Sequence, residues 1–238
     1  MLGGMSWESS ALYYRIVNEE ARRRLGGTAS APSILWTVDF AEVERLQVAG
    51  AWDAAGALLA DAARRVEAAG AEVLVLCTNT MHKVAPAIEA AIGIPLLHIA
   101  DVTAAAIAAD GRRTVGLLAT RYTMEQDFYR DHLRERFGIG VLVPGPADRE
   151  ELHRIIFDEL ALGIFTDASR ARWGRMVDEL LARGAEGVVL GCTEVELLVP
   201  ADRDDRLYPS ARLHAVAAVD AAMAPPVTPP DRPRERAT

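Results

Sequence analysis

Short apolar runs alternate with longer amphipathic segments along most of the chain. Val73–Leu76, Val115–Leu118 and Val188–Leu190 are apolar runs of strand length, too short to form helices. Trp52–Ala69 and Arg170–Arg183 instead repeat apolar residues at the spacing of one helix face. Regular alternation of strands and helices is typical of parallel sheets flanked by helices. The pattern therefore predicts an α/β fold.

Other segments carry more local predictions. We expect one uninterrupted helix over Tyr122–Phe137, a loop over Pro144–Arg149 and a helix over Glu151–Gly163. At the start, only Met1 and Leu2 precede a Gly-Gly turn that should follow a strand, so we expect that strand to begin upstream of Met1.

An internal repeat links the two halves of the chain. Residues 70–80 read GAEVLVLCTNT and residues 184–194 read GAEGVVLGCTE, 114 residues later, which predicts a duplicated α/β unit. In this alignment Thr78 matches Cys192, whereas Cys77 matches a glycine. Side chains alternate sides along a strand. We therefore expect Thr78 and Cys192 to face one cleft and Cys77 to point away from it.

The repeat divides the chain into two pseudo-symmetric, Rossmann-like lobes with a central parallel sheet in each. We expect the first lobe to comprise residues 1–103 plus 209–223 and the second to comprise residues 104–208. Residues 224–238 are rich in proline and charge, which predicts a disordered tail.

Cys192 is the clearest candidate for a reactive side chain. It follows a predicted strand and a glycine, at the edge of the sheet where open α/β folds bind ligands. A thiol at a helix N-terminus faces unpaired N–H groups and the positive end of the helix dipole, which favour the thiolate. The alternative interpretation is a small buried core residue.

Composition narrows the possible partners and setting. The chain has 238 residues, half of them apolar, and a net charge of −8, which argues against a nucleic-acid partner. Two distant cysteines and the lack of an apolar run of about 20 residues favour a cytoplasmic protein without disulfides or a membrane span. The five histidines are scattered and no phosphate-binding glycine pattern occurs, so neither a metal nor a nucleotide cofactor is expected.

Several motifs resemble one known family. GGMSWESS near the start, CTNTMHK in the middle and GCTE late in the chain are similar to the aspartate/glutamate racemase family, in its aspartate racemase-like, broad amino-acid branch. VDFAEVERLQ and GLLATRYTM fit the same branch, and the resemblance extends from Gly3 to about Met223. It implies two lobes with the active site between them, a homodimer, and amino-acid racemisation without pyridoxal phosphate or metal.

The resemblance also implies roles for individual residues. Two residues, usually both cysteines, exchange protons with opposite faces of the substrate Cα, and here Cys192 and Thr78 occupy those positions. A threonine hydroxyl is a far weaker acid than a thiol, so we expect slow or absent turnover in one stereochemical direction. The remaining positions implied in substrate binding are Met5, Gln47, Asn79, Thr80, Thr120, Thr193 and Glu194.

Some of these residues also have structural interpretations. Thr78 could cap the following helix, Glu194 could be a capping acid or bind the substrate ammonium, and His82 and His214 could be packing residues. Ile164 stands where relatives often carry a lysine that could hold a distal carboxylate, which puts acidic substrates in question.

Two other functional classes remain open at this point. Single-cysteine relatives of the same fold are decarboxylases or maleate-type cis-trans isomerases, which act on related carboxylic acids. The unequal Thr78 and Cys192 pair is also compatible with a non-catalytic amino-acid-binding protein.

Overall fold

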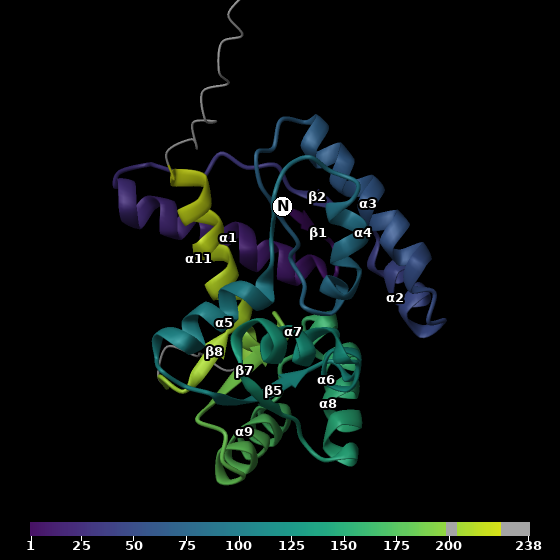
Figure 1. Ribbon diagram of the computed structural model, residues 1–238, viewed down its shortest axis with the longest axis vertical. Coiled ribbons are helices and arrows are strands. Elements are labelled where there is room, and N and C mark those ends of the chain that lie inside the picture. The colour runs from purple at the N-terminus through teal and green to yellow at the C-terminus, as the bar shows by residue number, and fades with distance from the viewer. Residues whose placement is uncertain (199–203, 225–238) are drawn as a thin grey trace, which may run out of the picture.

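The computed structural model describes residues 1–198 and 204–224, which form two stacked α/β lobes (Figure 1). The predicted tail beyond Ala224 lies outside the described residues. The helices of the first lobe and of the connection are α1 (Trp7–Leu25), α2 (Phe40–Val48), α3 (Trp52–Ala68), η1 (Thr80–Val84), α4 (Ala85–Glu89) and α5 (Ile99–Ala109). The later helices are α6 (Arg121–Glu125), α7 (Asp127–Phe137), α8 (Pro146–Asp158), η2 (Leu160–Leu162), α9 (Asp167–Ala182), α10 (Val195–Leu198) and α11 (Ser210–Met223).

The strands confirm the predicted duplication. In the first lobe, parallel pairs join β1 (Leu2–Gly3) to β2 (Trp36–Thr37) and β3 (Leu74–Val75) to β4 (Leu96–Leu97). A bridge between Leu2 and Leu76 connects the pairs, which gives the order β2-β1-β3-β4. The second lobe has the parallel order β6-β5-β7-β8, formed by β5 (Thr114–Ala119), β6 (Gly140–Leu142), β7 (Gly187–Gly191) and β8 (Leu207–Pro209). Strands β3 and β7 therefore hold equivalent inner positions.

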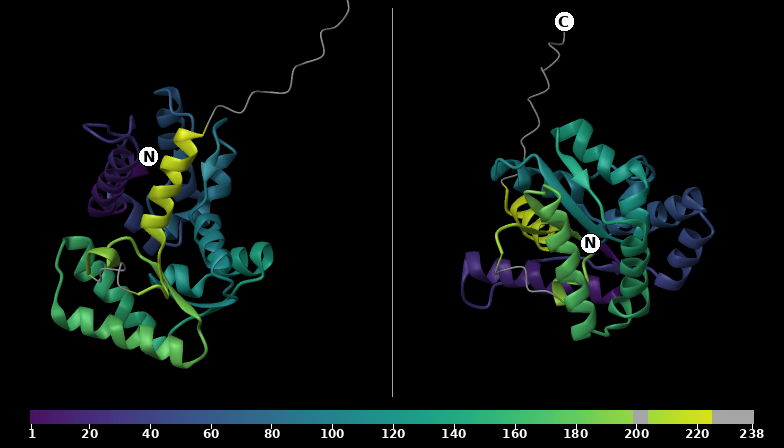
Figure 2. Two further views of the ribbon diagram at one scale, coloured as in Figure 1. Left: turned by 90° about the vertical axis from the view of Figure 1, so that its left-hand side faces the viewer. Right: turned by 90° about the horizontal axis from the view of Figure 1, so that it is seen from below.

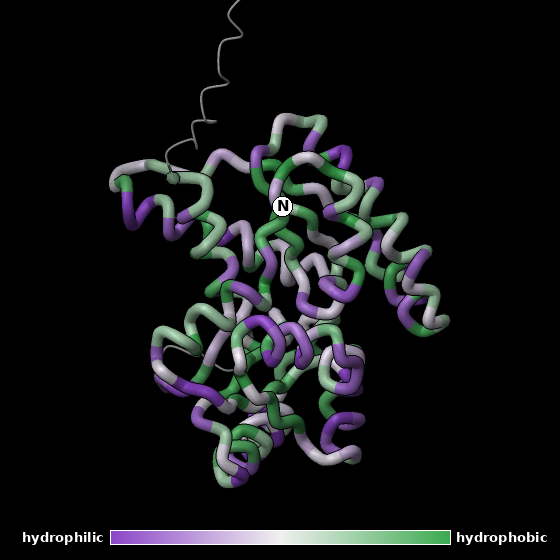
Figure 3. The backbone as a smooth tube through the Cα atoms, in the orientation of Figure 1, coloured by the Kyte–Doolittle hydropathy of each residue, from purple (hydrophilic) through white to green (hydrophobic). Residues whose placement is uncertain are grey.

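Apolar side chains fill both lobes. The strands run through the interior, and polar segments lie mainly on the outer helices (Figure 3). Helix α11 returns from the second lobe to pack beside α1, where Ala211, Ala215 and Val219 share a buried cluster with Leu12 and Ile16 (Figures 1 and 2). Within the described parts of the chain, no helix has the length and apolar character needed to cross a membrane.

Helix α5 bears on the expected lobe boundary. The division between residues 103 and 104 falls inside this helix. Its buried residues Ile99, Ala100, Ala104 and Ile107 all pack in the cluster that forms the core of the second lobe. This packing favours a boundary that precedes α5.

Two local predictions in the second lobe are wrong. The expected helix over 122–137 is divided into α6 and α7 by Gln126, whose backbone is extended with φ −88° and ψ 144°. The Gln126 side chain accepts a hydrogen bond from Lys83, which ties this break to η1. The expected loop over 144–149 instead contains the start of α8, because Pro146 is accommodated in the first turn of a helix, where its missing N–H costs nothing.

Helix α8 also ends earlier than the sequence predicts. The predicted helix over 151–163 stops at Asp158, and Glu159, with φ −124° and ψ −68°, leads into the short helix η2. This change of direction brings Ala161 to the region between the lobes.

Candidate active site

A pocket lies where the carboxyl ends of β3, β5 and β7 meet, and its cavity volume is about 30 Å³. All nine residues singled out in the sequence line it. They are Met5, Gln47, Thr78, Asn79, Thr80, Thr120, Cys192, Thr193 and Glu194. The structure thus brings together residues from both halves of the chain, as the repeat predicts.

The turn after β7 places Cys192 in the pocket. Gly191 ends the strand, and a Cβ atom there would come within 2.9 Å of Ala119 Cβ and Leu117 Cδ1, so the close approach to β5 requires glycine. The Cys192 side chain is buried, and its Sγ donates a hydrogen bond to Glu194 Oε2 at 3.1 Å. The thiol is therefore held against a carboxylate.

The expectation of a stabilised thiolate at Cys192 is wrong. Burial and the neighbouring Glu194 carboxylate raise the pKa of Cys192 well above its ordinary value. The backbone N–H groups of Glu194 and Val195 act in the opposite direction, with smaller effect. Of the following helix, α10, the structure describes the four residues Val195–Leu198. Cys192 is accordingly a thiol at neutral pH.

Glu194 is the centre of a hydrogen-bond network that sequence reasoning missed. Ser6 Oγ donates to Glu194 Oε1 at 2.6 Å, and Thr193 Oγ1 donates to Glu194 Oε2 at 2.7 Å. The hydroxyl of Ser9 in turn hydrogen-bonds to that of Thr193. Ser6 is also the N-cap of α1, accepting from Ser9 N. The GGMSWESS motif could have predicted Ser6 as an N-cap, but it could not predict a contact with a residue 188 positions away.

The turn after β3 places Thr78 in the same pocket. Its side chain is buried, and the carbonyl of Thr78 lies 2.7 Å from His82 Nδ1. His82 Nε2 accepts from Ile99 N at 3.2 Å, which assigns the Nδ1–H tautomer that donates to Thr78. Burial and nearby histidines hold the pKa of His82 well below its usual range. His82 is therefore a neutral residue that fixes the Thr78 backbone.

His214 is also a packing residue in this structure. It is buried, its Nε2 donates to Leu97 O at 2.8 Å, and its Nδ1 accepts from Tyr13 OH at 2.9 Å. Burial lowers the pKa of His214 to about 4, so the ring is neutral at neutral pH.

Two amide side chains leave acceptor oxygens unmatched in this region. Asn79 Nδ2 donates to Ser210 Oγ, which itself donates to Leu190 O, and this fixes the orientation of the Asn79 amide. Gln47 Nε2 donates to Met81 Sδ at 3.0 Å. Asn79 Oδ1 and Gln47 Oε1 are both buried without a partner among the described residues. Buried acceptors of this kind favour a ligand that carries N–H donors.

Hydrogen bonds between threonine hydroxyls link the two lobes at the pocket. Thr80 Oγ1 lies 2.9 Å from Thr120 Oγ1 and 3.0 Å from Thr123 Oγ1. Thr120 is the N-cap of α6, so its hydroxyl also accepts from Thr123 N. Thr80 and Thr120 come from different lobes, and their contact holds the two strand ends together.

Cys77 lies away from the pocket, as the strand alternation predicts. It is fully buried in the cluster between α1, β3 and α11, and its Sγ faces Val75 O at 3.8 Å. Burial raises the pKa of Cys77 to about 12, which makes it a poor nucleophile.

Ile164, where the family resemblance implies a lysine in many relatives, lies outside the pocket lining. Its side chain is 48% exposed and is not part of the pocket lining, whereas Ala161 lines the pocket. The early end of α8 and the turn through η2 explain the difference. Ile164 therefore gives no argument about acidic substrates in this structure.

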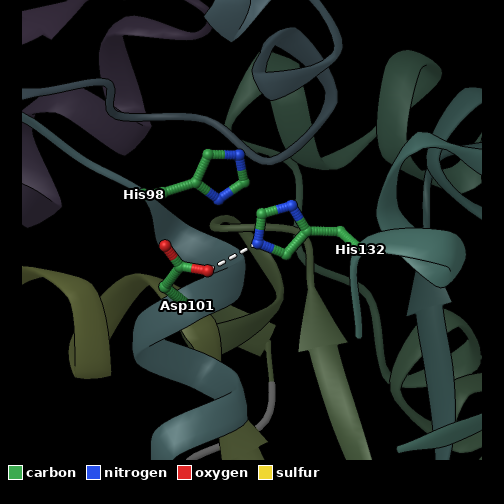
Figure 4. Close-up of side chains that lie close together, drawn as sticks. All are labelled: His98, Asp101 and His132. Carbon is green, nitrogen blue, oxygen red and sulfur yellow. Dashed lines mark hydrogen bonds and ion pairs between the residues drawn. The ribbon is translucent and has the colours of Figure 1, made fainter. Parts of the chain in front are cut away.

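A separate cluster brings together His98, Asp101 and His132, whose potential ligand atoms lie within 4.8 Å of one another (Figure 4). His132 Nε2 is 2.5 Å from Asp101 Oδ1. The His98 and His132 rings are stacked, with centroids 4.3 Å apart and planes 5° from parallel. Nitrogen lone pairs lie in the ring plane, so stacked rings cannot both point at one ion. The cluster therefore has the geometry of a packing contact between α5 and α7.

These features define a two-lobed α/β protein with a polar pocket between duplicated strand ends. The sequence model of the Asp/Glu/hydantoin racemase family matches residues 2–224. Because this match covers nearly the whole chain, the protein belongs to that family, and the resemblance found in the motifs is confirmed.

Solved structures agree with this assignment. An Asp/Glu racemase candidate from Yersinia pestis is 51% identical, with a TM-score of 0.84 over 94% of this chain and 97% of its own. An aspartate racemase homologue from Pyrococcus horikoshii is 33% identical, with a TM-score of 0.79 over 93% and 96%. The aspartate racemase of Picrophilus torridus, at 15% identity and a TM-score of 0.71 over 93% and 92%, shows the shared fold alone. The family, together with the Yersinia pestis and Pyrococcus horikoshii relatives, supports a racemase function.

Proposed function

We propose that the protein is a cofactor-independent amino-acid racemase that transfers protons at Cα. The observation that carries the proposal is the placement of Thr78 and Cys192 at equivalent strand ends in one pocket. Proton transfer on opposite faces of one carbon requires two groups placed on opposite sides of it, and a duplicated fold supplies such a pair.

Glu194 is the acceptor that activates Cys192 in this proposal. Its Oε2 already accepts the thiol hydrogen bond, so it takes the thiol proton and becomes a neutral carboxyl group. The substrate ammonium then offsets the negative charge of the Cys192 thiolate. The resulting thiolate removes the Cα proton. The Thr78 hydroxyl donates a proton to the opposite face, and water restores that hydroxyl.

Binding of the amino-acid backbone uses the polar groups around these two residues. The substrate ammonium is placed near Glu194 and the unmatched oxygens of Asn79 and Gln47. The substrate carboxylate is placed against the hydroxyls of Thr80, Thr120 and Thr193. These hydroxyls would hold the carboxylate in a fixed orientation and stabilise the negative charge that develops as the Cα proton is removed.

Deuterium exchange tests the proposal directly. The enzyme is incubated in D₂O with L- and D-amino acids, and label at Cα is measured by NMR, with Cys192→Ala as the control. Exchange that depends on Cys192 supports proton transfer at Cα. An absence of exchange with every amino acid contradicts the proposal.

A second candidate function follows from the single thiol in the pocket. One cysteine opposite a threonine is also compatible with decarboxylation of a substituted malonate or cis-trans isomerisation of a maleate-like acid. Product formation from such acids without Cα exchange in amino acids would favour this alternative. A non-catalytic binder would bind an amino acid and show neither reaction.

We also propose a cytoplasmic homodimer, which follows from composition and from the family resemblance. Sedimentation of the purified protein at several concentrations measures the oligomeric state, and a monomer at every concentration contradicts it.

A further inference from the structure

One wall of the pocket is apolar and is built from both lobes. Phe40 at the start of α2 and Phe157 in α8 are stacked, with ring centroids 6.0 Å apart and planes 22° from parallel. Ile156 in α8 and Ala161 in η2 complete this wall beside them. Ile156 is buried, and the other three are partly buried. We call Phe40, Ile156, Phe157 and Ala161 the apolar wall.

Apart from Gln47 in α2, the polar groups of the pocket lie at or just after the strand ends, and none belongs to the apolar wall. Thr78 and Asn79 follow β3, Thr120 follows β5, and Cys192 follows β7. A substrate whose Cα lies between Thr78 and Cys192 therefore has its backbone groups among these polar residues. The apolar wall is the part of the lining left for its side chain.

Positive charge is missing from the part of the lining that the structure describes, which includes no lysine, arginine or histidine. Two cations on flanking elements, Arg121 and Lys83, are already engaged. Arg121 donates to Glu150 at 2.6 Å, and Lys83 lies over the Trp52 ring at 4.2 Å while donating to Gln126.

His153 does not supply the missing charge. Its ring packs against Phe157, with centroids 4.6 Å apart, and His153 is not among the residues that line the pocket. Burial and the nearby Arg121 lower the pKa of His153, which favours the neutral imidazole at neutral pH.

A second carboxylate in this pocket would therefore lack a partner. Glu194 already lines the pocket, and its partners are the thiol and hydroxyl groups of Cys192, Thr193 and Ser6. A charged group that is removed from water without a counter-ion is strongly disfavoured. The side-chain carboxylate of aspartate or glutamate would face the apolar wall and add to the charge of Glu194.

We infer that the preferred substrates are amino acids with uncharged, apolar side chains, and that Phe40, Phe157 and Ala161 determine this preference. The inference rests on the proposed function, because it assumes that the amino-acid Cα lies between Thr78 and Cys192. It concerns only the side chain, so it can fail while the proposed chemistry stands.

The test compares initial rates of Cα deuterium exchange for L- and D-methionine and leucine with those for aspartate and glutamate. We expect rates at least tenfold higher for methionine and leucine in the wild-type enzyme. Aspartate or glutamate exchange that equals or exceeds methionine exchange overturns the inference and leaves the proposed function in place. No exchange with any of the four overturns both.

A charge-insertion variant sharpens the test. Ala161→Lys places a cation at the apolar wall, and Ala161→Met is the control of similar length without charge. We expect the ratio of aspartate to methionine exchange to rise at least tenfold in Ala161→Lys relative to Ala161→Met. An unchanged ratio in a folded Ala161→Lys protein contradicts the role of this wall.

Discussion

The ends of β3 and β7 occupy the same place in the two lobes but carry different chemistry. After β7, the Cys192 thiol donates to Glu194, and hydroxyls of Ser6 and Thr193 also donate to that carboxylate. After β3, Thr78 is held through its backbone carbonyl by the neutral His82. One arm therefore has an adjacent proton acceptor, and the other is fixed in position without a basic group beside its hydroxyl among the described residues.

This difference indicates a division of labour between duplicated positions. A thiol paired with a carboxylate can lose its proton, whereas an alcohol is suited to giving one to a much stronger base. Because enantiomers have equal free energies, kcat/KM for racemisation must be the same in both directions. The unequal arms can therefore appear in kcat or KM separately, and in exchange without inversion, but cannot make the reaction one-way.

Loss of the thiol should have the largest effect. Cys192→Ala removes the group that abstracts the proton, and we expect Cα exchange to fall by about 10³-fold, within the usual range for a general base. Cys77→Ala is the matched control, because that thiol lies in the core and outside the pocket lining. Exchange rates should stay close to wild type in the control. Equal losses in both variants would remove the distinction between the two cysteines.

The threonine arm should affect inversion more than exchange. Thr78→Ala removes the donor on one face, so we expect formation of the opposite enantiomer to fall by about 10²-fold. Exchange with retention, through Cys192 alone, should persist. Thr78→Cys restores a protic group and should recover inversion. Chiral chromatography measures the inverted product, and wild-type inversion in Thr78→Ala would show that water replaces this arm.

Substitution of the Glu194 carboxylate should make the Cys192 thiol more acidic and at the same time slow catalysis. Glu194→Gln removes the negative charge that raises the pKa of Cys192, so alkylation by iodoacetamide near neutral pH should become faster. Exchange should nevertheless fall by about 10²-fold, because the amide cannot accept the proton. Glu150→Gln, at an exposed ion pair, is the control.

The pH dependence of alkylation follows from the same shift. In wild type the raised pKa keeps Cys192 protonated at neutral pH, so the alkylation rate should rise with pH and not level off below about pH 9. In Glu194→Gln the profile should move to lower pH. A wild-type plateau near pH 7 would mean that the free enzyme holds a thiolate.

The smallest effect is expected from removing the Ser6 hydrogen bond that holds the Glu194 carboxylate. Ser6→Ala removes one hydrogen bond to this carboxylate, and we expect kcat/KM to fall by about tenfold, which corresponds to about 1.4 kcal/mol. Ser6 is also an N-cap, so stability should fall by about 1 kcal/mol. Thr166→Ala removes the N-cap of α9, away from the pocket lining, and should lower stability without the same loss of kcat/KM.

The fold and the membership of the pocket were largely predictable from sequence. Strand-length apolar runs and the GAE repeat carry the α/β alternation and the pairing of Thr78 with Cys192, because both depend on local periodicity. The division at Gln126 was not predictable, since it depends on a contact with Lys83 from the other lobe.

The electrostatics of the site were less predictable than its location. The thiol pKa depends on burial and on the direction of the Glu194 carboxylate, neither of which is encoded in the GCTE motif alone. The Ser6 contact with Glu194 and the stack of Phe40 on Phe157 join segments distant in sequence. Such contacts require the packed arrangement of the two lobes.

The configuration of exchanged substrate in Thr78→Ala tests the inequality of the two arms most directly. Both enantiomers of methionine are incubated separately in D₂O, and label at Cα and configuration are measured before substantial conversion. We predict that one enantiomer takes up deuterium with retention, through Cys192, while the other exchanges much more slowly. Equal exchange of both enantiomers, or inversion at the wild-type rate, would contradict it.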